Sequence, residues 1–87
     1  MLAIEKADDL SCEEITRGLE AAQTFFNQHS IIPSLVYKHV KAASTGGSYV
    51  SGFVELWDVA GQLAIKSAFG DREPTERPTL VWTGSDF

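Results

Sequence analysis

The start of a helix at Ser11 is the feature that most constrains how this chain folds. Ser11 and Glu14 form a capping box, in which each side chain accepts a hydrogen bond from a backbone N–H of the first turn. Leu10 and Ile15 stand at the two ends of a hydrophobic staple. The apolar residues that follow at spacings of four, three and four are Ile15, Leu19, Ala22 and Phe26. The sequence therefore predicts an amphipathic helix over about residues 12–28.

The chain after Pro33 predicts a sheet. Pro33 is expected to block continuation of the helix, and the hydrophobic period then changes to two, with many β-branched and aromatic residues. The expected strands are 35–42, 49–57, 62–69 and 79–83, with a glycine turn at 44–48, a hairpin loop at 58–61, an exposed charged loop at 70–78 and a tail at 84–87. The predicted fold class is α+β, an N-terminal helix packed on a four-stranded antiparallel meander (α-β-β-β-β), in a single domain over residues 1–87.

Residues 54–68 leave one alternative open. Leu56, Ala60, Leu63 and Ser67 also fit a helical stripe, so this segment could be a second helix. Two observations favour strands instead: Gly61 costs a helix interior about 1 kcal/mol relative to alanine, and β-branched and aromatic residues are dense before it.

Charge and composition narrow the classes of partner. Seven basic and 12 acidic residues give a net charge of −5, which argues against non-specific binding to nucleic acid or to an anionic membrane and suits a basic protein partner better. No apolar run approaches the roughly 18 residues of a membrane span. The N-terminus lacks the pattern of a signal peptide, and the single cysteine, Cys12, excludes an intrachain disulfide. We therefore expect a cytoplasmic protein.

The predicted sheet has one face that the lone helix does not cover. Tyr49, Phe53, Glu55 and Trp57 point to one side of the strand at 49–57, and Tyr37 of the preceding strand lies beside them. Such an aromatic face is unusual if it meets only water, so these five residues are the candidate interaction surface, for a homodimer or another protein partner. The alternative for Trp57 is that it fills the domain's own core.

Catalytic and metal-binding signatures are missing from the sequence. Cys12 and the two histidines, His29 and His39, do not form a CxxC, HxxxH or HExxH pattern, so no catalytic residue, metal or cofactor is predicted. A non-enzymatic interaction or regulatory module is the leading hypothesis. The alternative is a small-molecule-binding or hydrolase-like domain, with a pocket at the helix–sheet or dimer interface and Glu55 or His39 as the acid–base group.

Two small folds share parts of this pattern. The helix-then-meander order is similar to the cystatin-like arrangement, in which a sheet wraps around a helix, but the inhibitor motif QxVxG is missing and the first hairpin reads Ser44-Thr-Gly-Gly-Ser-Tyr49. Inhibition of cysteine proteases is therefore not implied. The segment from Leu56 to Ala64 is similar to the closing strands of hot-dog thioesterase domains, which also contain an Asp-x-x-Gly-x-Leu turn. Both resemblances concern the fold and imply no function.

Overall fold

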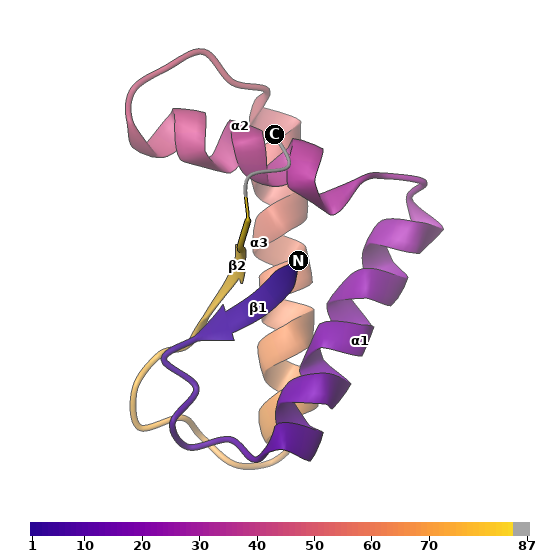
Figure 1. The fold of residues 1–87 in the computed structure, drawn as a ribbon, viewed down its shortest axis with the longest axis vertical. Helices are drawn as coiled ribbons and strands as arrows, with labels where there is room; N and C mark the ends of the chain where they lie inside the picture. The colour runs from indigo at the N-terminus through magenta and orange to yellow at the C-terminus, as the bar shows by residue number, and fades with distance from the viewer. Residues whose placement is uncertain (85–87) are drawn as a thin grey trace.

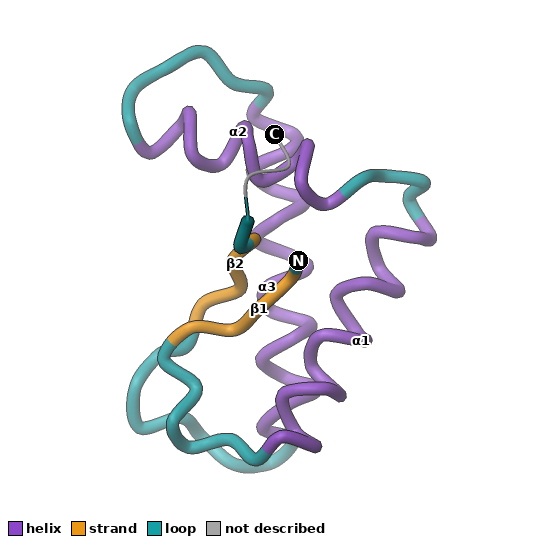
Figure 2. Tube along the Cα trace, viewed as in Figure 1, coloured by secondary structure: helices purple, strands orange, loops and turns teal. Residues whose placement is uncertain are grey.

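The chain folds into three helices and one small antiparallel sheet (Figure 1). This computed structural model describes residues 1–84. The elements in chain order are β1 (Leu2–Glu5), α1 (Cys12–Gln28), α2 (Pro33–Ser44), α3 (Ser51–Phe69) and β2 (Thr79–Trp82). Figure 2 shows the strands on one side of the α1–α3 pair, with α2 crossing one end of it. The predicted four-stranded meander is wrong, because the described part of the chain is mostly helical with two strands.

Helix α1 confirms the prediction made from its capping box. Ser11 is the N-cap; its Oγ accepts from Glu14 N at 3.2 Å, and its own backbone N–H donates to Glu14 Oε1 at 2.9 Å. Leu10 is buried and Ile15 packs against its cluster, as the staple requires. The inward stripe includes Ala22 and Phe26, which are fully buried. This stripe packs mainly on helix α3, in place of the expected sheet.

Helix α2 replaces the strand predicted at 35–42. Pro33 begins this helix, because a proline in the first turn has no hydrogen bond to lose and already has a helical φ. The side chains that face the core recur at helical spacing: Pro33, Val36, Tyr37 and Val40. The β-branched residues pointed to a strand, but burial on one helical face outweighs that preference. The chain does turn after Ser44, although the turn joins two helices.

Helix α3 replaces the two strands predicted at 49–57 and 62–69. The alternative of a helix over 54–68 is the interpretation that the structure supports. Its inward face shares Leu56 and Ala60 with the expected stripe, but Leu63 is exposed. The other residues that are buried or packed inward include Phe53, Trp57, Ala64, Ala68 and Phe69. Because Leu56–Ala64 is helical, neither resemblance to a meander fold retains its structural basis.

The sheet joins the first and last elements of the chain. Leu2 pairs with Trp82 and Glu5 with Thr79 in antiparallel register. The strand predicted at 79–83 is confirmed over Thr79–Trp82, but its partner is β1, which the sequence did not predict. Part of the predicted tail, residues 85–87, lies outside the described residues.

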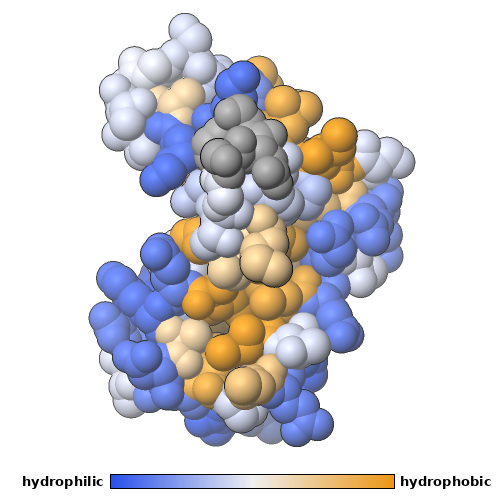
Figure 3. Space-filling model, in the orientation of Figure 1, coloured by the Kyte–Doolittle hydropathy of each residue, from blue (hydrophilic) through white to orange (hydrophobic). Residues whose placement is uncertain are grey.

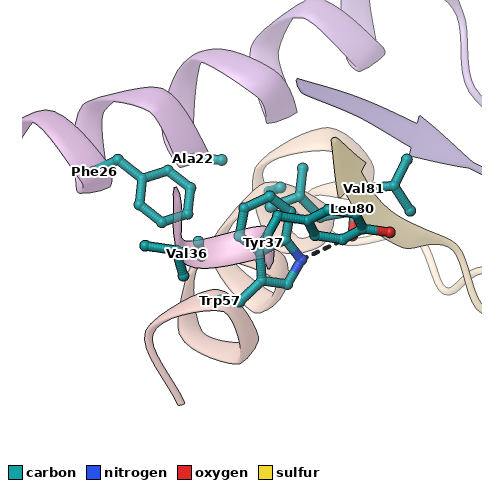
Figure 4. Packing of buried hydrophobic residues seen from close by; sticks show 9 residues of the cluster. Ala22, Phe26, Val36, Tyr37, Trp57, Leu80 and Val81 are labelled. Carbon is teal, nitrogen blue, oxygen red and sulfur yellow. Dashed lines mark hydrogen bonds between the residues drawn. The ribbon is translucent and has the colours of Figure 1, made fainter. Parts of the chain in front are cut away.

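The main core lies where α1, α2, α3 and β2 meet (Figure 4). The Trp57 ring packs 5.4 Å from Phe26 and 4.7 Å from Tyr37, between ring centroids. Trp57 Nε1 donates to Leu80 O at 2.9 Å, which satisfies a buried donor and joins α3 to β2. On the face that carries the sheet, apolar surface gathers over the strands and the adjoining side of α1 (Figure 3).

Helices α1 and α3 cross closely at the other end of their contact. A Cβ on Gly18 would lie 2.6 Å from Ala64 O, closer than real atoms approach, so glycine is required at this crossing. Arg17 spans the same crossing, donating from Nε to Ser67 O at 2.6 Å and from its terminal nitrogen to Ala68 O at 3.0 Å. These carbonyls belong to the last turn of α3, where a cation is favoured by the helix dipole.

Candidate ligand-binding groove

The five residues predicted to form an interaction surface are dispersed by the helical fold. Tyr37 and Trp57 are 8 % and 5 % exposed and pack against each other in the core. Tyr49 is 49 % exposed in the segment before α3, and Glu55 is exposed on α3 itself. Because residues 49–57 do not form a strand, the aromatic sheet face that was to carry the surface does not exist. For Trp57, the alternative of filling the core is the one observed.

Phe53 and His39 form a second small contact, at the junction of α2 and α3. Phe53 is half-buried, and its ring meets the His39 ring edge to face at 4.9 Å. His39 Nδ1 accepts a hydrogen bond from Val50 N at 3.1 Å, so this imidazole secures the connection between the helices. The hydrogen bond and the ring contact give His39 a structural role at the junction of the two helices. Glu55, the other residue suggested as an acid–base group, is exposed on α3 and makes no hydrogen bond with His39 among the described residues.

The remaining candidate ligands of a metal are spread over the surface. Cys12 is exposed in the first turn of α1. His29 lies at the opposite end of that helix, where its ring packs at a tilt against Phe25, with centroids 4.3 Å apart. Within residues 1–84, no group of three histidine, cysteine or acidic residues lies close enough to hold a metal ion.

A groove lies between α3 and β2. It encloses about 750 Å³ and is bounded by one side of α3, the start of β2 and the turn after β1. Its lining residues are Lys6, Trp57, Asp58, Gly61, Gln62, Ile65, Lys66, Arg77, Pro78, Thr79 and Leu80. A hollow of about 450 Å³ elsewhere is lined by α1 residues alone, so the α3–β2 groove is the one that several elements build together.

Three cations line this groove in a protein that is acidic as a whole. They are Lys6, Lys66 and Arg77, out of seven basic residues in the chain. Within the described residues, none of the three makes an ion pair or a side-chain hydrogen bond. Arg17, Lys41 and Arg72 are occupied by contrast, with helix carbonyls, the Tyr37 ring and the Glu14 carboxylate respectively. Most of the unengaged positive charge is therefore gathered at one concave site.

Separate elements supply the three cations. Lys6 follows β1 in a left-handed backbone conformation, with φ of 61°, which turns the chain out of the sheet. Arg77 stands two residues before Thr79, the residue that pairs with Glu5, so the register of the sheet brings Lys6 and Arg77 to the same end. Lys66 comes from α3, and Gln62 precedes it by one helical turn.

The floor of the groove is apolar and fixed in place. Trp57, Ile65 and Leu80 contribute to it, and the bond from Trp57 Nε1 to Leu80 O holds its two walls together. A site of this kind pairs a hydrophobic surface with a few positioned polar groups, which is the usual composition of a small-ligand site. Asp58 is the one carboxylate in the lining, and the described lining includes no histidine or cysteine.

A polar network holds the loop that carries Arg77. Arg72 pairs with Glu14 at 2.7 Å, and the Thr75 hydroxyl donates to Asp9 Oδ2. The hydroxyl and then the backbone N–H of Thr75 lower the pKa of the Asp9 carboxyl, with a further contribution from the Arg72 charge. The pKa of Glu14 is lowered mainly by the backbone N–H of Ser11 and also by Arg72. Loop 70–78 is thus tied to the start of α1.

Of the five residues predicted for an interaction surface, Trp57 lines the groove, but the sequence did not indicate the three cations. Lys6, Lys66 and Arg77 stand far apart along the chain and belong to no motif. Their association depends on the pairing of the first strand with the last, and β1 was not predicted. The sequence showed only isolated basic residues, which are ordinary on a protein surface.

Comparison with known proteins does not assign a function to the groove. No family model matches the chain, and no curated protein or solved structure matches it at a significant level. In the part of the chain that the structure describes, no helix has both the length and the apolar character that a bilayer span needs.

Proposed function

We propose that this chain is a non-enzymatic binding domain whose α3–β2 groove takes a small anionic ligand with an apolar body. The observation that carries the proposal is the gathering of Lys6, Lys66 and Arg77, all without partners among residues 1–84, over an apolar floor. Of the two function classes that the sequence left open, this one corresponds to a small-molecule site between helix and sheet.

The lining favours binding over catalysis. Asp58 has no histidine, cysteine or second carboxylate beside it in the described lining, and general acid–base or nucleophilic chemistry depends on such pairs. Three cations and the Gln62 amide supply donors, which suits a carboxylate or phosphate group. The apolar floor at Ile65 and Leu80 suits a ring or a short chain attached to that group.

The charge within the groove, and not the net charge of the chain, determines which ligand the groove favours. The net charge of −5 would repel an anion at long range, but salt screens that repulsion beyond about 8–10 Å. At contact distance the cations of the groove dominate. The basic partner expected from overall charge would suit other parts of the surface, and the groove itself favours an acidic ligand.

Phenyl phosphate and phenol provide a direct test, because they share a ring and differ in charge. We expect phenyl phosphate to shift the backbone amide resonances of Gln62, Lys66 and Leu80 in a two-dimensional NMR titration, and phenol to shift them much less. Replacing Lys6 and Arg77 together by alanine should weaken binding by about tenfold or more, since a charge-assisted hydrogen bond contributes about 1.5–3 kcal/mol.

Lys38→Ala is the matched control, because Lys38 is exposed on α2 and lies outside the groove. It should bind phenyl phosphate as the wild type does. Equal binding by the Lys6/Arg77 double variant, or shifts confined to residues outside the groove, would show that the proposal is wrong.

A further inference from the structure

The outer side of α3 carries an apolar stripe that the rest of the fold leaves largely uncovered. Val59 and Leu63 are 43 % and 39 % exposed, and Leu56 at the edge of the stripe is partly exposed, with its other side packed against the main core. At 3.6 residues per turn, Val59 lies about 160° around the helix from both Trp57 and Gly61, which face the core and β2. The stripe therefore points away from the sheet.

The layering of the fold explains why the stripe is open. Strands β1 and β2 lie on one side of the α1–α3 pair, and α2 crosses one end of it (Figure 1). Val59 and Leu63 stay exposed on the side away from the strands. Single exposed apolar residues are normal on a protein surface. Leu56, Val59 and Leu63, however, follow one another at spacings of three and four, the pattern by which one helix packs along another.

We propose that two copies of this chain associate through this stripe, with their α3 helices antiparallel. A two-fold axis close to Val59 would place Leu56 of one copy against Leu63 of the other, because these residues lie on opposite sides of Val59 at similar distances along the helix. Val59 would meet Val59 of the second copy at the axis. The same surface thus serves both copies, as a two-fold interface requires.

The charges beside the stripe select the antiparallel direction. Glu55 and Lys66 are both exposed and lie along the same edge of the stripe, near its two ends. The two-fold axis of an antiparallel pair reverses the helix direction but leaves each residue on the same edge of the interface. Glu55 of each copy therefore meets Lys66 of the other, which gives two ion pairs. A parallel pair would place Glu55 level with Glu55 and Lys66 level with Lys66. Opposite charges therefore meet only in the antiparallel arrangement.

Association through α3 does not depend on the ligand proposed for the groove. Only Lys66 belongs to both surfaces, and its pairing with Glu55 of the second copy would leave Lys6 and Arg77 as the unpaired cations of the groove. Lys6 and Arg77 lie on the groove side alone, so the groove keeps two cations for a ligand. The mass of the particle in solution reports association, and the phenyl phosphate titration reports the groove. Either proposal can fail while the other stands.

Sedimentation equilibrium over a wide concentration range tests the stripe. The wild type should reach twice the mass of one chain, and Val59→Glu should remain at the mass of one chain with an unchanged circular dichroism spectrum. Leu35→Glu is the matched control, since Leu35 on α2 is 45 % exposed, close to Val59. It should associate as the wild type does. A wild type that stays monomeric, or dissociation by Leu35→Glu in place of Val59→Glu, would overturn the proposal.

Charge exchange tests the direction of the helices. Glu55→Lys and Lys66→Glu should each weaken association severalfold, because each places like charges together twice. The double variant, Glu55→Lys with Lys66→Glu, should restore association, since it recreates both ion pairs with their signs exchanged. If the double variant is as weak as the single ones, the antiparallel arrangement is wrong.

Discussion

The two ends of the α1–α3 contact are built on different principles. At one end, which we call the crossing end, Gly18 lies against Ala64 and Ala68, and the helix backbones approach closely. At the other, the aromatic end, Phe26 packs on Trp57 and the rings fill the space between the helices. At the crossing end, small residues let the two helices touch through their backbones. At the aromatic end, large side chains fill the space between the helices.

This difference determines which substitutions each end tolerates. The aromatic end should suffer when volume is removed, because a cavity loses apolar burial and packing. The crossing end should suffer when volume is added, because the atom in the way is a backbone oxygen that cannot move alone. Paired substitutions at the two ends can test this contrast.

Phe26→Ala should have the largest effect. Phe26 is fully buried between α1, α2 and α3, and truncation of such a side chain costs about 3–5 kcal/mol. Chemical denaturation monitored by circular dichroism measures the loss. Phe25→Ala provides the comparison, since Phe25 is only partly buried on the same helix. If Phe26→Ala lowers the free energy of unfolding no more than Phe25→Ala does, the Phe26 ring is not the main packing residue of the aromatic end.

Gly18→Ala should destabilise the fold by about 2 kcal/mol, because the added methyl group forces the helices apart. Gly52→Ala is the matched control. Gly52 lies in α3 with open space around its position, so alanine should stabilise the protein there, by up to about 1 kcal/mol. If the free energy of unfolding falls for Gly18→Ala and rises for Gly52→Ala, the close approach of the helices, and not helix propensity, determines the effect of alanine at position 18.

The two tryptophans sharpen the comparison within the aromatic end. Trp57→Phe removes the bond to Leu80 O and leaves that carbonyl without its partner, which should cost about 2 kcal/mol. Trp82 Nε1 is buried and has no hydrogen-bond partner among residues 1–84, so Trp82→Phe should change the free energy of unfolding by less than about 1 kcal/mol. Equal losses in the two variants would contradict this difference.

The smallest effect concerns acid pH at the crossing end. The folded-state pKa of Glu14 lies below its usual 4.5, so its contribution to stability is complete above 4.5 and is lost as the pH falls through the lowered value. Glu14→Gln should therefore be less stable than the wild type at neutral pH. The two proteins should converge in acid, as thermal unfolding at several pH values would show. A constant difference at every pH would point to another cause.

The sequence predicts the elements whose signals are local. Ser11 and Glu14 satisfy each other within one turn, so the start of α1 can be recognised without knowing its partner. The final strand was also predicted, but its pairing with β1 could not be, because that depends on residues at the opposite end of the chain.

The middle of the chain was misread for a physical reason. Residues such as Val36, Tyr37 and Trp57 favour extended backbone by propensity, and their burial on the inward faces of α2 and α3 outweighs it. The groove was beyond prediction for a related reason. Lys6 and Arg77 meet only because of the sheet register, which no local pattern encodes.

The pairing of β1 with β2 also affects the order in which the molecule is completed. Residues 2–5 must wait for residues 79–82, so during synthesis the three helices emerge before the sheet can close. Closing so long a loop carries an entropic cost that local helix contacts do not bear. Until Leu80 is present, the Trp57 N–H lacks the acceptor that it has in the folded chain, so we expect water to hydrate it. We also expect a truncated chain that ends before residue 79 to pack more loosely than the full chain.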